Sequence, residues 1–297
     1  MNKKIIFEGS CVAIVTPFNS DMSVNYEELG RLIEFQIENG TDAIVSCGTT
    51  GEGATLSEEE HEKVMEYTIK KVAGRIPVIA STGSNDTAFC VKLSQQAEKM
   101  GADGLLLVTP YYNKATQNGL IKMFTTIADA STKPLILYNV PSRTGVDIAP
   151  STYAALADHP MIGAIKEASG NLSKVAETAH LVGDKLDIYS GNDDQIVPIL
   201  SLGGAGVISV LSNPMPKATS RMCHAFFEGN IEEARKLQLD LIPLINALFS
   251  EVNPIPAKAA MAAMGFCENY LRLPLIPMED AHEQMLLQKM RDLGLNV

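Results

Sequence analysis

The sequence predicts an α/β protein, a (β/α)8 or TIM barrel followed by a C-terminal helical appendage. Eight short apolar runs rich in β-branched residues alternate with longer segments of helical period, and they recur at intervals of about 20 to 34 residues. Such alternation indicates parallel strands joined by crossover helices, and eight units close a barrel more economically than they extend an open sheet. The runs are apolar along most of their length, as strands buried on both faces must be.

The strand candidates are short and lie between turn-forming residues. They are CVAIVTP from 11, AIVSCG from 43, PVIAST from 77, GLLLVTP from 104, PLILYNV from 134, MIGAIKEAS from 161, LDIYSGND from 186 and GVISVLSN from 206. Between them, Ser57 with Glu60 matches a capping box, and Asp86 is a favoured N-cap residue. Glycines suited to end helices follow several of these segments, at Gly40, Gly74, Gly101 and Gly183.

The region after Pro214 contains helix patterns and no further strand candidate. We expect helices over about 215–228, 231–249, 256–265 and 279–293. The first completes the barrel, which predicts a catalytic barrel over 1–229 and a C-terminal helical domain over 230–297. The Leu- and Met-rich faces of the later helices can pack either on the barrel or against another subunit, and both arrangements remain open.

The composition argues against several classes of function. The 297 residues have a net charge of −11, and the longest basic runs are the pairs Lys3-Lys4 and Lys70-Lys71, so no nucleic-acid partner is expected. No 18 apolar residues run together, and the apolar part of MNKKIIFEGS is too short for a signal peptide. We therefore expect a cytoplasmic protein without a membrane partner.

The positions of cysteine and histidine argue against disulfide and metal chemistry. The five cysteines are odd in number and widely spaced, which fits neither a disulfide framework nor a zinc site, so we expect reduced core thiols. All five histidines fall in predicted helices or at their ends, and none follows a strand candidate. A Ser-His triad, a histidine base and a His-ligated metal lose support, and no metal is expected.

Lys166 lies at the end of the sixth strand candidate, directly after the apolar residues Ala164 and Ile165. Burial there would lower the pKa of the lysine, because desolvation penalises the ammonium. At the ordinary pKa only about one lysine in 2,500 is neutral at pH 7, so a lowered pKa creates a nucleophile for carbonyl carbons. A lysine that points to solvent is the alternative. Glu167 should face away from Lys166, because neighbouring strand residues alternate.

Polar residues follow most strand candidates, and in a barrel the C-terminal strand ends form the active site. Thr49 and Thr50 follow the second candidate, Tyr112 follows the fourth, Tyr138 lies at the end of the fifth, and Arg143 follows the fifth. Paired Thr and Tyr hydroxyls can relay a proton. Arg143 is suited to bidentate capture of a substrate carboxylate. The alternatives are tyrosines that only complete the core and an arginine in a surface salt bridge.

The glycine-rich segment GTTGEG at 48–53 directly follows a strand candidate. Its N–H groups can form a nest that binds a carboxylate. No Lys-Ser/Thr follows the glycines and the spacing is not GxGxxG, so no nucleotide cofactor is expected. A tight turn that only joins a strand to a helix is the alternative.

Seven motifs occur in one order along the chain: GTTGE at 48–52, TPYYNK at 109–114, LYNVPSRTG at 137–145, IKEASGN at 165–171, SGNDD at 190–194, GVISV at 206–210 and NPIP at 253–256. Together they resemble the 4-hydroxy-tetrahydrodipicolinate synthase (dihydrodipicolinate synthase) family, within the class I pyruvate-dependent aldolases. The resemblance covers nearly the whole chain. It implies condensation of pyruvate with L-aspartate 4-semialdehyde to 4-hydroxy-tetrahydrodipicolinate, the committed step of diaminopimelate and lysine biosynthesis, with no cofactor.

The resemblance also implies a role for each matching residue. Lys166 would form a Schiff base with pyruvate, while Tyr138, Thr49 and Tyr112 would relay protons. Tyr112 would come from the neighbouring subunit of a tight dimer, within a homotetramer built as a dimer of dimers.

The remaining matches concern substrate binding. Thr50 matches a contact to the pyruvate carboxylate, Arg143 matches the residue that recruits the semialdehyde, and Gly191 and Ile208 match backbone positions that line the pyruvate pocket.

Two other functions compete with the synthase. An N-acetylneuraminate lyase or 2-keto-3-deoxy sugar-acid aldolase would share Lys166, Tyr138 and the GTTGE turn, and Arg143 is the feature that favours the synthase. A catalytically silent barrel acting as a regulator or scaffold is the other. Intact Lys166, Tyr138 and Thr49 argue against that function.

The chain departs from the family at the feedback site for L-lysine. Glu58 stands where the family commonly has histidine, and Phe89 stands where it has glutamate, although His61, Asn85 and Tyr111 match. Loss of the glutamate removes a partner for the ammonium of the effector. We therefore expect weak or absent inhibition by lysine.

Overall fold

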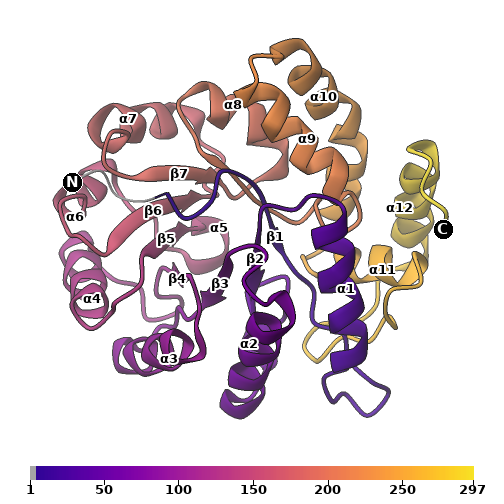
Figure 1. Ribbon diagram of the computed structural model, residues 1–297, viewed down its shortest axis with the longest axis horizontal. Helices are drawn as coiled ribbons and strands as arrows, with labels where there is room; N and C mark the ends of the chain where they lie inside the picture. Colours follow the sequence, from indigo (N-terminus) through magenta and orange to yellow (C-terminus); the bar gives the residue numbers. More distant parts are fainter. Residues whose placement is uncertain (1–4) are drawn as a thin grey trace.

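The predicted barrel is present in the computed structural model, which describes residues 5–297 (Figure 1). Eight parallel strands pair in sequence order and close through β1 and β8. They are β1 Gly9–Ala13, β2 Ala43–Ser46, β3 Val78–Ser81, β4 Gly104–Val108, β5 Leu135–Asn139, β6 Ile162–Glu167, β7 Asp187–Ser190 and β8 Gly206–Ser209. The fold class is confirmed.

β1 begins two residues earlier than predicted, at Gly9. The strands β1 and β8 approach closely there, because a Cβ on Gly206 would lie 2.0 Å from the Gly9 carbonyl oxygen. Only glycine allows that approach. Glycine has a low strand propensity, so the sequence pattern did not indicate that the strand begins at Gly9.

Helices surround the barrel (Figure 1). They are α1 Tyr26–Glu38, α2 Glu58–Val72, α3 Thr87–Met100, α4 Gln117–Asp129, α5 Pro141–Thr144, α6 Pro150–Leu156, α7 Leu172–Val182, α8 Ile196–Ser201 and α9 Pro216–Phe227, with 3-10 turns η1 Gly53–Thr55 and η2 Asp193–Gln195. The capping box of Ser57 with Glu60 and the N-cap of Asp86 are confirmed.

The predicted helix ends are confirmed in part. Gly101 caps α3 with a φ of 102°, the left-handed conformation that favours glycine. Gly183 caps α7 in a right-handed conformation instead, and Ala73 rather than Gly74 is the cap of α2.

Alternate strand residues fill the barrel interior, as the two-residue period of a strand requires. The inward-facing set is mainly small and aliphatic, with Phe7 and Tyr189 stacked 4.2 Å apart between ring centroids. Phe7 precedes β1, so this stack lies toward the end of the barrel opposite the carboxyl strand ends. Ala164 belongs to the interior set, so Lys166, two residues later on β6, faces the same interior.

The C-terminal helices are α10 Ile231–Leu248, α11 Ile255–Ala263 and α12 Asp280–Asp292, close to the predicted ranges. They share a hydrophobic cluster with α8, α9 and Val207 of β8, so their apolar faces pack on one side of the barrel (Figure 1). The sequence left open whether these apolar faces pack on the barrel or against another subunit. In the structure they are buried against the barrel within one chain.

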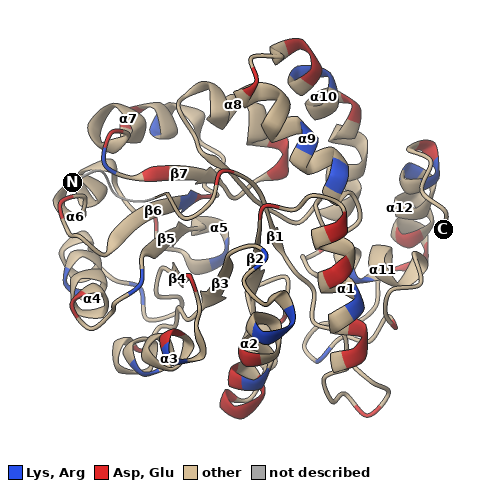
Figure 2. Cartoon of the chain, viewed as in Figure 1, with Lys and Arg blue, Asp and Glu red and all other residues tan. Residues whose placement is uncertain are grey.

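Charged residues of both signs are interspersed along the outer helices (Figure 2). Within residues 5–297 we find no helix that is both long and apolar enough to cross a membrane. The interpretation of MNKKIIFEGS lies partly outside the described residues, because it includes residues 1–4. All five cysteines are buried and free, as expected.

Candidate active site

Lys166 lies at the inner face of β6, between Tyr138 of β5 and Tyr189 of β7 in the strand register. Only 7% of the residue is exposed, and its Nζ lies 4.2 Å from the centroid of the Tyr138 ring. The alternative of a solvent-facing lysine is therefore wrong.

The surroundings of Lys166 favour a neutral amine. Its pKa is lowered to about 8, chiefly by burial; Cys11 and Asp193 oppose the shift, and Arg143 adds to it. At a pKa near 8 about one lysine in ten is neutral at pH 7, so the nucleophilic form is common rather than rare.

Gly191 leaves room for the side chain of Lys166, because it has no side chain of its own. A Cβ on this glycine would lie 3.2 Å from Cε of Lys166 and 2.8 Å from Cβ of Ala168. Its amide donates to the Glu167 carbonyl oxygen at 2.7 Å, which fixes the end of β7 against β6. A larger residue here would require Ala168 to shift and would press on the side chain of Lys166.

Glu167 points away from Lys166, as strand alternation predicts. Its carboxylate accepts hydrogen bonds from the Asn139 side chain at 3.1 Å and from the Ser169 amide at 2.7 Å. This carboxylate is thus committed to the layer between strands and helices, and proton transfer at Lys166 falls to other groups.

Tyr138 lies next to Lys166, and Thr49 is hydrogen-bonded to Tyr138. Tyr138 is 8% exposed, and burial raises the pKa of its phenol, while Arg143 and a hydrogen bond with Thr49 lower it. The phenol is therefore neutral at pH 7 and able both to donate and to accept. Ile208 is buried in the barrel interior on β8.

Thr50 and Arg143 are connected through Asn253, which precedes α11. The Asn253 side-chain amide donates to Thr50 Oγ1 at 3.0 Å, and Arg143 Nη2 donates to the Asn253 carbonyl oxygen at 3.2 Å. Arg143 and Asn253 border a hollow of about 630 Å³, lined by Ser142, Arg143, Phe249, Ser250, Glu251, Val252 and Asn253. Across residues 5–297 Arg143 forms no ion pair with a carboxylate, so the salt-bridge alternative finds no support.

Asp193 is a site residue that the sequence did not single out. It is 2% exposed, and its Oδ2 accepts from the amides of Val210 at 3.0 Å and Leu211 at 2.8 Å. Its Oδ1 is buried without a hydrogen-bond partner in the described part of the chain. Burial raises the pKa of Asp193 and the charge of Lys166 lowers it, so the two groups attract each other. The sequence signal available for Asp193 was its position at the end of the seventh strand candidate.

A buried ion pair also escaped the sequence interpretation. Glu52 has a left-handed φ of 52°, and its carboxylate contacts Lys258 of α11, which is fully buried. Lys258 also donates to the Thr16 carbonyl oxygen at 2.6 Å. The C-terminal helices therefore hold the turn that carries Thr49 and Thr50. Within that turn, the amide of Gly53 donates to the Gly48 carbonyl oxygen at 3.1 Å.

Tyr112 does not lie in the site of its own chain. It is 94% exposed and has a left-handed φ of 69°, while the neighbouring Tyr111 is 40% exposed. A large apolar ring left in solvent is typical of a surface that another subunit covers.

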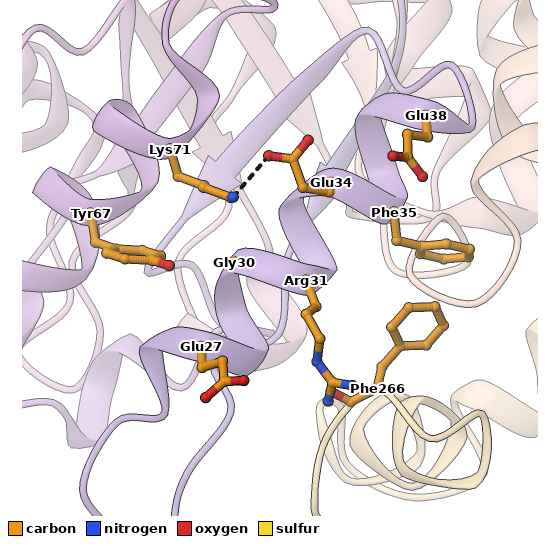
Figure 3. A pocket seen from close by; sticks show the side chains of 9 residues that line it. All are labelled: Glu27, Gly30, Arg31, Glu34, Phe35, Glu38, Tyr67, Lys71 and Phe266. Carbon is orange, nitrogen blue, oxygen red and sulfur yellow. Dashed lines mark hydrogen bonds and ion pairs between the residues drawn. The ribbon is translucent and has the colours of Figure 1, made fainter.

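The remaining polar groups and surface hollows lie apart from Lys166. His61 lies behind the turn at 48–53, with its Nε2 2.9 Å from the Ser81 carbonyl oxygen. Searching residues 5–297 finds no group of three His, Cys, Asp or Glu side chains placed to hold a metal ion. A second hollow, between α1, α2 and Phe266, is lined by none of the rim residues (Figure 3).

The fold and the rim together define an enzyme class: a (β/α)8-barrel lyase with a buried lysine of lowered pKa at the mouth of the barrel. The chain belongs to the Dihydrodipicolinate synthetase family, whose sequence profile matches residues 6–293.

Known proteins of this family are similar along the whole chain. The 4-hydroxy-tetrahydrodipicolinate synthase of Caldicellulosiruptor saccharolyticus is 55% identical over 292 residues, covering 98% of this chain and 99% of that protein. The crystal structure of dihydrodipicolinate synthase from Aquifex aeolicus has a TM-score of 0.96 at 45% identity, covering 98% and 99% of the two chains. A monomeric dihydrodipicolinate synthase variant has a TM-score of 0.96 at 43% identity and covers 98% of each chain.

Proposed function

We propose that the barrel mouth condenses pyruvate with L-aspartate 4-semialdehyde to 4-hydroxy-tetrahydrodipicolinate, in diaminopimelate and lysine biosynthesis. The observation that carries the proposal is the buried Lys166 beside the Tyr138 ring. Membership of the family and the name of the 55% identical relative support the choice of reaction.

Lys166 acts as the nucleophile. Its neutral amine attacks the keto carbon of pyruvate, and loss of water leaves an iminium that withdraws electrons. The pyruvate methyl group then loses a proton to give an enamine, whose carbon attacks the aldehyde. Ring closure by the amino group of the second substrate displaces Lys166 and releases the product.

Hydroxyl groups move the protons. Tyr138 is neutral and hydrogen-bonded to Thr49, so a proton can pass from one oxygen to the other. Tyr112 of a neighbouring subunit completes the relay, which accounts for its exposure in a single chain. The assembly proposed is a homotetramer, built as two tight dimers that share this tyrosine.

The two substrates present carboxylates at different points of the rim. Thr50 and the backbone at Gly191 and Ile208 hold pyruvate, and Arg143 holds the carboxylate of the semialdehyde by its guanidinium. Residues 1–229 supply the catalytic barrel and 230–297 the helical domain that supports it. The five free thiols fit a reaction in the reducing cytoplasm.

The central test is a trapping experiment. Incubation with pyruvate and borohydride should reduce the iminium to a stable adduct on Lys166, identified by mass spectrometry of peptides. Lys166→Ala should give none, whereas Lys185→Ala, at an exposed ion pair, should label fully. A wild-type protein that forms no adduct overturns the proposal, and an adduct without turnover of the semialdehyde points to a sugar-acid aldolase or lyase.

A further inference from the structure

Asn253 lies in the connection between α10 and α11, outside the barrel strands, and is 5% exposed. It contacts residues from two different strand ends. Its side-chain amide nitrogen donates to Thr50 Oγ1 at 3.0 Å, and its backbone carbonyl oxygen accepts from Arg143 Nη2 at 3.2 Å. These two partners are the side chains that bind the substrate carboxylates in the proposed function.

The direction of the first hydrogen bond determines what Thr50 can do. A hydroxyl has one hydrogen and two lone pairs, and the N–H of Asn253 occupies a lone pair. The hydroxyl hydrogen of Thr50 is then free for another acceptor. A carboxylate only accepts, so Thr50 is prepared to bind it before the substrate arrives.

The contact to Arg143 acts in the same way. One N–H of the guanidinium is held by the Asn253 carbonyl oxygen, which limits the rotation of an otherwise exposed side chain. Further N–H groups of the planar fork remain available to a second carboxylate.

The side-chain oxygen of Asn253 is buried without a hydrogen-bond partner among residues 5–297. An unpaired buried acceptor costs stability, and an apolar side chain of similar size would avoid that cost. The residue is thus better explained by its donor nitrogen than by packing.

We propose that Asn253 is a positioning residue whose side-chain amide sets the hydrogen-bond polarity of Thr50, and thereby the affinity for pyruvate, while its backbone carbonyl oxygen restrains Arg143. This inference rests on the proposed function. It gives the C-terminal domain a direct part in substrate binding.

Two variants with opposite polarity test the proposal. In Asn253→Ala the donor is lost, and KM for pyruvate should rise about tenfold while kcat changes less than about threefold. In Asn253→Asp an ionised carboxylate accepts the hydrogen of Thr50 and repels pyruvate, so KM should rise by about a hundredfold or more. Leu239→Ala, on α10 and 63% exposed, lies outside the lining of the hollow and is the control, which should leave both constants unchanged.

The pH dependence separates positioning from a loss of structure. When the carboxyl group introduced by Asn253→Asp is protonated, it carries an O–H that can donate to Thr50. KM of Asn253→Asp should therefore fall toward the wild-type value as the pH is lowered from about 8 to 6. Asn253→Ala should show no such recovery. If Asn253→Ala does not fold, the pH dependence of KM in Asn253→Asp tests the proposal by itself.

Thr50→Val adds a second readout. If Asn253 acts through this hydroxyl, Asn253→Ala should change KM for pyruvate little in a Thr50→Val background. Unchanged KM values in Asn253→Ala and Asn253→Asp, in a wild-type protein that traps pyruvate on Lys166, would overturn this inference alone. Absence of the wild-type adduct would instead overturn the proposed function.

Discussion

The reactivity of Lys166 comes from its position more than from any single partner. The lysine is held by β6 with its Nζ over the Tyr138 ring, in a space that Gly191 leaves open. Burial is the largest cause of its lowered pKa. The same burial makes the later iminium costly, because a positive charge out of water needs a compensating group.

Asp193 is placed to supply that compensation, and its effect on pH dependence can be predicted. Its carboxylate raises the pKa of Lys166, so Asp193→Asn should lower that pKa further. Because adduct formation requires the neutral amine, its rise with pH, near pH 8 in the wild type, should move about one pH unit lower in the variant. Turnover should fall about tenfold or more, because the iminium loses its counter-charge.

The measurement is the rate of borohydride-trapped adduct formation between about pH 6 and pH 10, a range that brackets the pKa of Lys166. Asp194→Asn is the matched control, since Asp194 is exposed next to Asp193 and should leave the profile unchanged. A profile that is identical in wild type and Asp193→Asn would show that Asp193 has no electrostatic role at the lysine.

Replacing Arg143 should affect the two substrates differently. Arg143→Ala should leave formation of the pyruvate adduct within about threefold of wild type, while kcat/KM for the semialdehyde falls about a hundredfold, as expected for a lost charged contact. Trapping yields and steady-state kinetics measure the two effects separately. Equal losses of both would assign a structural role to this arginine.

The candidate catalytic residues at the strand ends could be predicted from the sequence, and residues whose position depends on distant contacts could not. Strand ends of a barrel converge by topology, so Lys166, Tyr138 and Thr49 were expected together once eight strands were counted. Asn253 contacts Thr50 across 203 positions of the chain, and no local pattern indicates such a pair. Asp193 followed a predicted strand, but its role depends on the amides of Val210 and Leu211, which only the folded chain brings near.

At the scale of elements, α11 fixes the turn after β2. Glu52 is 4% exposed and Lys258 is fully buried, and their side chains are hydrogen-bonded to each other. Without its partner, either charge would be buried and uncompensated. Sequence periodicity predicted α11 as a helix and the turn as glycine-rich. It gave no sign that a lysine of one would reach a carboxylate of the other.

Removing one member of this pair should destabilise the fold strongly. Lys258→Met leaves the Glu52 carboxylate buried and unpaired, which should cost about 3–5 kcal/mol and lower the midpoint of thermal unfolding by about 5–15 °C. Lys236→Met, at an exposed pair with Asp240, should change it by less than about 2 °C. Calorimetry checks both, and a Lys258→Met protein as stable as wild type would refute the role of the pair.

The start of α2 and α3 carries the departures from the family's feedback site. Glu58 of α2 forms an ion pair with Lys92 of α3, and Phe89 of α3 presents no charge. L-lysine would find no carboxylate at position 89 for its ammonium. We expect activity to be unchanged by lysine at about 1 mM, a concentration at which only binding stronger than about 4 kcal/mol would register. A submillimolar inhibition constant would contradict this expectation.

At the scale of the whole molecule, one chain holds most of the site but lacks one group of the proposed relay. Lys166, Tyr138, Thr49 and Arg143 meet at the barrel mouth, whereas Tyr112 projects into solvent from the loop after β4. The barrel was predictable because its signal repeats eight times. The assembly has no such repeating signal, and the expectation of a shared Tyr112 rests on the resemblance to the family alone.

Mixing two inactive variants tests whether Tyr112 serves a neighbouring subunit. Lys166→Ala keeps Tyr112, and Tyr112→Phe keeps Lys166, so a mixed dimer holds one complete site only if the tyrosine acts across the interface. Tyr112→Phe alone should lose about 10²-fold or more in kcat, as for a missing proton-transfer group. After unfolding and refolding of an equal mixture, random pairing makes half of the dimers mixed, so about a quarter of wild-type activity should return. No recovery, or an active monomer in analytical ultracentrifugation, would place the relay within a single chain.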